Sequence, residues 1–154
     1  MNLEEMNMSH LLSKGCLVFG ALLILGVVSS QAQGGYAVSV EVPFAFTAGN
    51  SHFEEGRFLI KEGSAGLDML LVSSLEGKGG ALLLTNGTMP EKGSNNKPRL
   101  IFNQYGDHYF LSQIWFGGGG GVGCQLERTK AEKETAQTAT AKNLKTAVIE
   151  IAAR

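Results

Sequence analysis

The stretch that decides the fold is RLIFNQYGDHYFLSQIW, residues 99–115. It contains two apolar segments, residues 99–104 and 108–116, joined by the short connection Tyr105-Gly106-Asp107. A glycine-containing connection of this length between two such segments is typical of a β-hairpin. Strict alternation would place Tyr109, Leu111 and Trp115 on one face of the second segment, and Phe110, Ile114 and Phe116 on the other. A strand that is apolar on both faces is typical of the covered centre of a sheet.

Five further segments show strand patterns: residues 37–46, 57–61, 68–74, 81–85 and 147–152. In the first, AVSVEVPFAF, apolar side chains recur at every second position, which indicates a half-buried strand. Pro43 has no amide hydrogen, so we expect it at an edge or a bulge. The last segment fits a strand, but a helix through Leu144, Val148 and Ile151 is an alternative. We read residues 89–98, which are polar and contain two prolines, as an exposed loop.

One helix is predicted near the C-terminus. Thr129-Lys130-Ala131-Glu132 matches a capping box, with Thr129 as N-cap and Glu132 three positions later. The helix should cover residues 130–142. The five glycines at 117–121 precede it, and we interpret them as a mobile loop because glycine loses the most conformational freedom on folding. The sequence thus predicts a mainly β domain, an antiparallel sandwich or small barrel of six to seven strands with one C-terminal helix.

The N-terminus predicts export. Residues 17–28 read LVFGALLILGVV, which is long enough for the apolar core of a signal peptide and shorter than the roughly 20 residues that span a bilayer. Ser30-Gln31-Ala32 supplies small residues for cleavage after Ala32. We therefore expect residues 1–32 to be a signal peptide and residues 33–154 a single secreted or periplasmic domain with no stable membrane span.

Two features of this segment leave alternatives open. Glu4 and Glu5 make the N-terminus acidic, whereas signal peptides begin with basic residues, so Met6 or Met8 is a rival start. An uncleaved membrane anchor is the alternative to a signal peptide. Cleavage would remove Cys16 and leave Cys124 as the only cysteine. Cys124 is then either a buried small hydrophobe, which we favour, or a reactive thiol.

Composition and motifs argue against several functional classes. The net charge is −1 at pH 7, so no basic excess indicates a nucleic-acid partner. His52 and His108 lack further ligands at a metal spacing, and the neighbouring Asp107 would point to the opposite face of a strand from His108. The sequence contains no nucleophile elbow and no phosphate-binding loop. We predict no catalytic residues, no metal and no cofactor.

Four segments resemble a family of small secreted, functionally uncharacterised proteins of soil bacteria. They are VPFAFTAGNSHFEEGRFLI (42–60), ALLLTN (81–86), RLIFNQYGDHYFLSQIW (99–115) and LERTKAEKE (126–134). The resemblance implies a signal peptide, a β-rich domain and a polar helix near the end. The chain departs from the family in its glycine run and at Cys124. No catalytic residues are known in the family, so none is carried over.

The leading hypothesis is an exported, non-enzymatic domain that binds a partner or forms part of the envelope. A protein or a glycan is the expected partner, and Tyr105, Tyr109 and Trp115 are the candidate binding residues, although aromatics at hairpin spacing are more often core. One alternative is a carrier of a small apolar ligand in a barrel cavity lined by Phe44, Phe46, Phe102, Leu111 and Trp115. The second alternative is an enzyme of unknown class.

Overall fold

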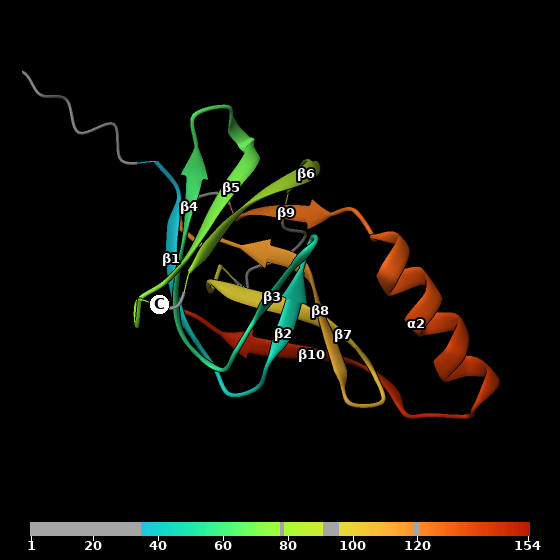
Figure 1. Cartoon of the computed structure of the whole chain (residues 1–154). Helices are drawn as coiled ribbons and strands as arrows, with labels where there is room; N and C mark the ends of the chain where they lie inside the picture. Colours follow the sequence, from blue (N-terminus) through green and yellow to red (C-terminus); the bar gives the residue numbers. More distant parts are fainter. Residues whose placement is uncertain (1–34, 78, 91–95, 119–120) are drawn as a thin grey trace, which may run out of the picture. The chain divides into compact units, whose positions relative to one another are not determined.

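The computed structural model describes residues 35–154 except 78, 91–95 and 119–120, and Gly35–Arg154 form one compact unit. The expected signal peptide and its cleavage site lie outside the described residues. The described chain is mainly β, with ten strands and one helix (Figure 1). The strands are β1 (Ala37–Val42), β2 (Phe46–Ala48), β3 (Ser51–Phe53), β4 (Gly56–Gly63), β5 (Gly66–Ser74), β6 (Gly80–Pro90), β7 (Arg99–Tyr105), β8 (His108–Trp115), β9 (Val122–Leu126) and β10 (Thr146–Ala152). The helix is α2 (Lys130–Ala141).

The ten strands form one sheet in the order β1-β4-β5-β6-β9-β8-β2-β3, and β7 pairs with both β8 and β10. Neighbouring strands are antiparallel except β2 and β8, which pair in parallel with Thr47 opposite Phe110. The hairpin expected at residues 99–115 is present as β7 and β8, with Tyr105 opposite His108. This hairpin lies inside the sheet, because β10 flanks β7 and β9 flanks β8.

β6 connects two parts of the sheet: β1, β4 and β5 lie on one side of it, and β9, β8, β7, β10, β2 and β3 lie on the other. Its first residues pair with β5, and its last residues pair with β9. Between Thr85 and Thr88 the register with β9 shifts, so that Asn86 and Gly87 together oppose Gln125. An extra residue of this kind bends a strand and increases its twist. The bulge thus allows one long strand to serve both parts.

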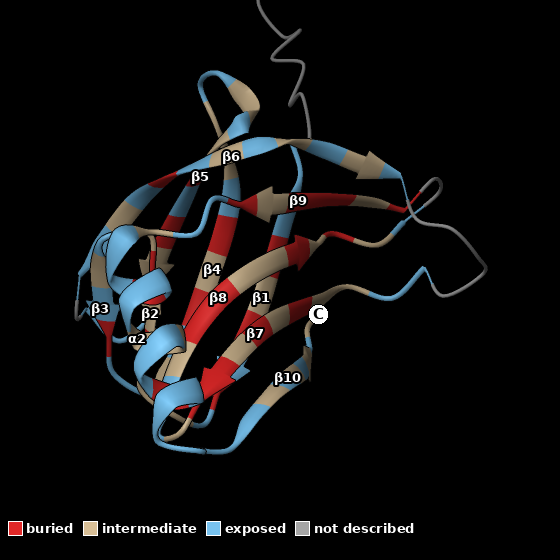
Figure 2. Ribbon diagram, turned by 90° about the vertical axis from the view of Figure 1, so that its right-hand side faces the viewer, coloured by how far each residue is buried: buried red, intermediate tan, exposed pale blue. Residues whose placement is uncertain are grey.

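One apolar core lies inside the sheet. Its buried side chains come from β1, β4, β5 and β6 as well as from β7, β8 and β9, which means that the sheet curves around a single core. Figure 2 shows buried segments repeated along β7, β8 and β9. The face of the sheet that points away from the core is therefore convex.

The C-terminal residues pair with β1, the first strand of the described chain. Ser39 and Arg154 each donate a backbone hydrogen bond to the other's carbonyl oxygen, both at 2.7 Å. Ala153 N–H also donates to the Pro98 carbonyl at 3.0 Å. The C-terminal residues therefore tie β1 to the end of β10.

Helix α2 begins as the sequence predicts and covers one part of the outer face. Thr129 is the N-cap, and its hydroxyl accepts a hydrogen bond from Glu132 N–H at 3.2 Å. The reciprocal half of the capping box, in which the Glu132 carboxylate would accept from the Thr129 backbone N–H, does not form. The Glu132 carboxylate contacts Asn103 and Tyr105 of β7 instead. Ala139 is buried against Tyr105 and Phe110, on the side of the β7–β8 hairpin opposite the main core.

The predicted number of six to seven strands is too low. The three strands that were missed are β2, β3 and β9, each of five residues or fewer. β9 follows directly on the glycine run, of which residues 119 and 120 lie outside the described part. β6 continues through Asn86-Gly87 to Pro90, so the loop expected from residue 89 begins later. The strand interpretation of the C-terminal segment is confirmed, and the helix alternative is wrong.

The predicted faces of β8 are also wrong. Phe102 pairs with Leu111, but Ile101 pairs with Gln113, which leaves Ser112 without a register partner on β7. This bulge reverses the alternation, because every later side chain moves to the other face. Ile114 therefore lies in the core, while Trp115 lies outside it.

Candidate functional site

The clearest surface feature is an apolar patch on the outer face of β5 and β6. Leu71 lies directly opposite Leu82, and Met69 lies opposite Leu84. Their neighbours Leu70, Val72 and Leu83 point into the core and are almost fully buried. The exposed fractions of the outward leucines are 39% for Leu71, 63% for Leu82 and 72% for Leu84. We call Met69, Leu71, Leu82 and Leu84 the leucine face.

The surroundings of the leucine face distinguish it from the rest of the outer surface. Near the β7–β8 hairpin, α2 covers the apolar side chains of the outer face, including Phe110. No helix of the described chain covers β5 and β6, and Figure 2 shows β6 mostly exposed or half-buried. On the β4 side, the exposed Lys61 lies opposite Leu71. The patch therefore consists of protruding leucines with a lysine beside them.

Tyr105 has a structural partner. It is buried beneath α2, and its hydroxyl donates to the Glu132 carboxylate at 3.4 Å. The same carboxylate oxygen accepts from Asn103 Nδ2 at 2.9 Å and lies 3.6 Å from Arg128 Nε. Burial, and then the negative charge of Glu132, raises the pKa of Tyr105 above its ordinary value. These contacts hold α2 on β7.

Tyr109 lies on the opposite side of the hairpin, facing the core. Its ring stacks on Phe44 with centroids 4.0 Å apart and planes 18° apart. Its hydroxyl accepts a hydrogen bond from Gln104 Nε2 at 3.1 Å. Stacking of this kind contributes to packing.

Trp115 lies in a row across the outer face, between Arg99 of β7 and Gly123 of β9. The guanidinium carbon of Arg99 is 4.8 Å from the ring centroid, and Arg99 Nε is 3.8 Å from a Glu150 carboxylate oxygen. A Cβ atom on Gly123 would approach the ring to 2.6 Å, so the indole lies over the glycine. Trp115 Nε1 donates to Gln113 Oε1 at 3.0 Å.

The three candidate binding aromatics therefore do not share one surface. Tyr105 is under the helix, Tyr109 faces the core, and Trp115 lies at the far end of β8 on the outer face. Of the side chains expected to line a carrier cavity, Phe46, Phe102 and Leu111 are buried in the core, and Phe44 packs against it. Trp115 is on the other side of the sheet.

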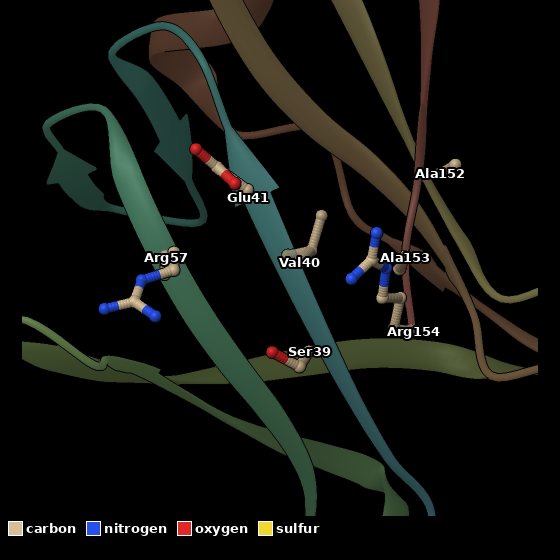
Figure 3. Close-up of a pocket in the computed structure, with 7 residues that line it drawn as sticks. All are labelled: Ser39, Val40, Glu41, Arg57, Ala152, Ala153 and Arg154. Carbon is tan, nitrogen blue, oxygen red and sulfur yellow. The ribbon is translucent and has the colours of Figure 1, made fainter.

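A surface pocket of about 420 Å³ lies where the C-terminus meets β1. Its walls include Glu41, Arg57 and Arg154 (Figure 3), and the two arginines lie on opposite sides of β1. Arg57 Nε lies 3.8 Å from a Glu76 carboxylate oxygen.

Cys124 is buried in the core, as the favoured reading of the sequence expects. Its thiol lies 3.7 Å from the Leu67 carbonyl oxygen. Burial raises the pKa of the Cys124 thiol to about 11, and the Asp68 and Glu62 carboxylates add to the effect. Because a reactive cysteine needs an accessible thiolate, the environment of Cys124 is unsuited to nucleophilic chemistry.

Within the described residues, no three side chains of the His, Cys, Asp or Glu type are grouped as metal ligands would be. No helix in this part of the chain is long and apolar enough to cross a membrane. Comparison of the chain with protein-family models, curated proteins and solved structures finds no match.

The leucine face was missed in the sequence, although a signal for it was present. Residues 82–84 are three consecutive leucines within a predicted strand. Because successive side chains of a strand point to opposite faces, such a run must place leucine on both sides of the sheet. The pattern alone does not distinguish a covered outer face from an exposed one.

Proposed function

We propose that the chain from Gln33 onwards is an exported, non-enzymatic domain of the cell envelope or extracellular space, and that it associates reversibly with a lipid surface through the leucine face. The observation that carries the proposal is the exposure of Leu82 and Leu84, which lie beside Leu71 on an uncovered part of the sheet. Contiguous exposed apolar side chains mark sites of interaction with proteins or membranes.

The small area and the convex shape of the leucine face favour a lipid surface as the partner. A stable protein interface buries about 800 Å² on each side, which is more than four side chains provide. The face is also convex, since the sheet curves around its core, and two convex surfaces meet over a small area. A lipid surface deforms around protruding leucines and accepts them among its acyl chains. Lys61 adds one positive charge beside the patch, which favours anionic lipids.

The expected binding is weak. Full burial of a leucine side chain contributes roughly 1.5–3 kcal/mol, and scaling this by the exposed fractions gives about 4 kcal/mol for the leucine face. That free energy corresponds to a dissociation constant of about 1 mM in accessible lipid. The domain would thus bind reversibly.

We take the sheet to be a small barrel whose seam is the Ser39–Arg154 pair, a view supported by the reciprocal hydrogen bonds at that point. We also take the chain to be a relative of the secreted soil-bacterial proteins that four of its segments resemble. The carrier alternative receives no supporting observation, because the expected cavity residues Phe46, Phe102 and Leu111 are buried in the core, where the rings of Phe46 and Phe102 contact each other edge to face.

The test is co-sedimentation of the chain from Gln33 onwards with vesicles at up to several millimolar lipid. One set is phosphatidylcholine alone, and the second contains a third of phosphatidylglycerol. We expect about half of the protein to sediment at roughly 1 mM accessible lipid. The double substitution Leu82→Thr and Leu84→Thr replaces both leucines by polar residues that favour strands, and it should weaken binding by more than about tenfold.

The matched control is Val148→Thr, because Val148 is an apolar side chain of β10 that is 69% exposed and lies outside the leucine face. This control should bind as the unsubstituted chain does. Equal sedimentation of the double variant and the control would contradict the proposal. A concentration-dependent dimer that the double variant abolishes, without vesicle binding, would assign the face to a second copy instead.

A further inference from the structure

The bulge in β6 places an asparagine and a glycine in an unusual position. Thr85 pairs with Leu126 and Thr88 pairs with Cys124, so Asn86 and Gly87 have no register partners of their own. Asn86 is exposed at this point of the strand. The pair is also the only Asn-Gly dipeptide in the sequence.

The space around Gly87 is open, next to the Asn86 side chain. Gly87 has a φ of 85°, and no heavy atom of another part of the chain lies within 4 Å of the position that a Cβ atom would occupy. With no side chain on Gly87, no Cβ atom hinders the approach of its backbone nitrogen to the Asn86 carboxamide. Asn103, by contrast, is held within β7 by its hydrogen bond to Glu132.

We propose that Asn86 is a site of spontaneous covalent modification, in which its carboxamide is converted to a carboxylate through a cyclic imide with Gly87. The Gly87 nitrogen attacks Asn86 Cγ, and a new N–C bond forms. The Cγ–NH₂ bond breaks, and the amino group leaves as ammonia with the hydrogen from the Gly87 nitrogen. Water then opens the imide at one of its two carbonyl carbons, giving aspartate or isoaspartate. No electrons are gained or lost, and water is the only co-reactant.

The position of the bulge gives the modification a consequence. A new negative charge appears two residues beyond Leu84, at the edge of the leucine face. Isoaspartate also adds one methylene to the main chain, and a bulge, in which two residues share one opposing residue, accommodates added length better than a regularly paired segment does. The folded domain should therefore survive the conversion. This inference does not depend on the proposed lipid binding.

The test is incubation of the folded chain from Gln33 onwards at 37 °C in mildly alkaline buffer, followed by proteolysis and mass spectrometry. Conversion replaces an amino group by a hydroxyl, and the peptide containing Asn86 should split into two products of equal mass that elute separately. We expect Asn86 to convert several-fold faster than Asn50, Asn103 or Asn143 in the same sample.

Two variants make the result specific. Asn86→Gln should stop the reaction at this site, because its longer side chain disfavours the five-membered ring. Gly87→Ala should slow the reaction several-fold, and circular dichroism checks its fold because alanine is strained at a φ of 85°. Conversion of Asn86 at the same rate as Asn103, or an unchanged rate in folded Gly87→Ala, would overturn the proposal.

Discussion

Ser39 and Arg154 exchange two backbone hydrogen bonds of 2.7 Å, and this pair joins the first strand of the described chain to its last residue. In an antiparallel ladder, a residue pair that exchanges both bonds is the element of regular pairing. The neighbouring Ala153 N–H donates to Pro98, so the C-terminus contacts both β1 and the chain just before β7. The pair leaves no gap between β1 and the C-terminal residues at this point.

Deletion of Ala153 and Arg154 should therefore destabilise the domain. The deletion removes three backbone hydrogen bonds, each of which contributes roughly 0.5–1.5 kcal/mol, so we expect a loss of about 2–3 kcal/mol. Urea unfolding measures the change. The control is Arg154→Ala, which keeps the backbone bonds and should cost much less. Equal losses in both variants would assign the effect to the arginine side chain.

Trp115 and Gly123 should show strong energetic coupling. Gly123→Ala places a methyl group against the indole and should destabilise the domain by roughly 1–3 kcal/mol. In a Trp115→Ala background the same change should cost far less, because the ring is gone. Trp115→Ala alone should cost about 1–3 kcal/mol, less than the loss expected for a buried tryptophan, because Trp115 lies outside the core. A double-mutant cycle by urea unfolding checks both statements.

Removal of the Glu132 carboxylate should loosen α2. Glu132→Ala leaves Asn103 and Tyr105 without their acceptor beneath the helix, and we expect a loss of roughly 1–3 kcal/mol. Glu134→Ala is the matched control on the same helix. Its exposed pair with Lys130 contributes roughly 0.2–0.5 kcal/mol. Chemical unfolding followed by helical circular dichroism compares them, and similar losses would show that the buried contacts do not hold the helix.

The thiol of Cys124 should be inert in the folded protein. Because its pKa is raised to about 11, it stays protonated at pH 8, and its burial blocks access for iodoacetamide. Labelling should occur only after unfolding in denaturant, which serves as the positive control. Rapid labelling of the folded chain at pH 8 would contradict the described environment.

The same pKa shift predicts how stability depends on pH. In the unfolded chain the thiol loses its proton near its ordinary pKa of 9, whereas the folded chain keeps it up to about 11. The unfolded state therefore binds fewer protons between these values, and the contribution of Cys124 to stability falls as pH rises through this window. Cys124→Ala should remove that part of the pH dependence, which unfolding curves between pH 8 and 11 would show.

Several elements could be predicted from local sequence alone. The alternation in residues 37–42 and the hairpin around Gly106 are local patterns, and both appear as strands in the structure. Thr129 caps α2 because its hydroxyl needs only the amide of Glu132, three residues away. Burial of Cys124 was also expected, since a lone cysteine behaves as a small hydrophobe.

The candidate site depended on contacts between distant segments. Whether Leu82 and Leu84 are covered depends on where α2 packs, and the position of α2 depends on the contacts of Glu132 with Asn103 and Tyr105. The bulge at Ser112 likewise moved Trp115 out of the expected cavity. The alternation of apolar residues along one strand does not show where the partner strand leaves a residue, such as Ser112, without a register partner.

The sequence by itself determined the type of the longer strands, the start of the helix and the apolar character of the core, because these follow from the spacing of residues a few positions apart. Tertiary structure alone decided the order of the strands, the bulges in β6 and β8, the Ser39–Arg154 pair and the exposure of the leucine face. Each of these depends on hydrogen bonds and packing between segments that are far apart in the chain. Such contacts produce no periodic pattern in the sequence of either segment.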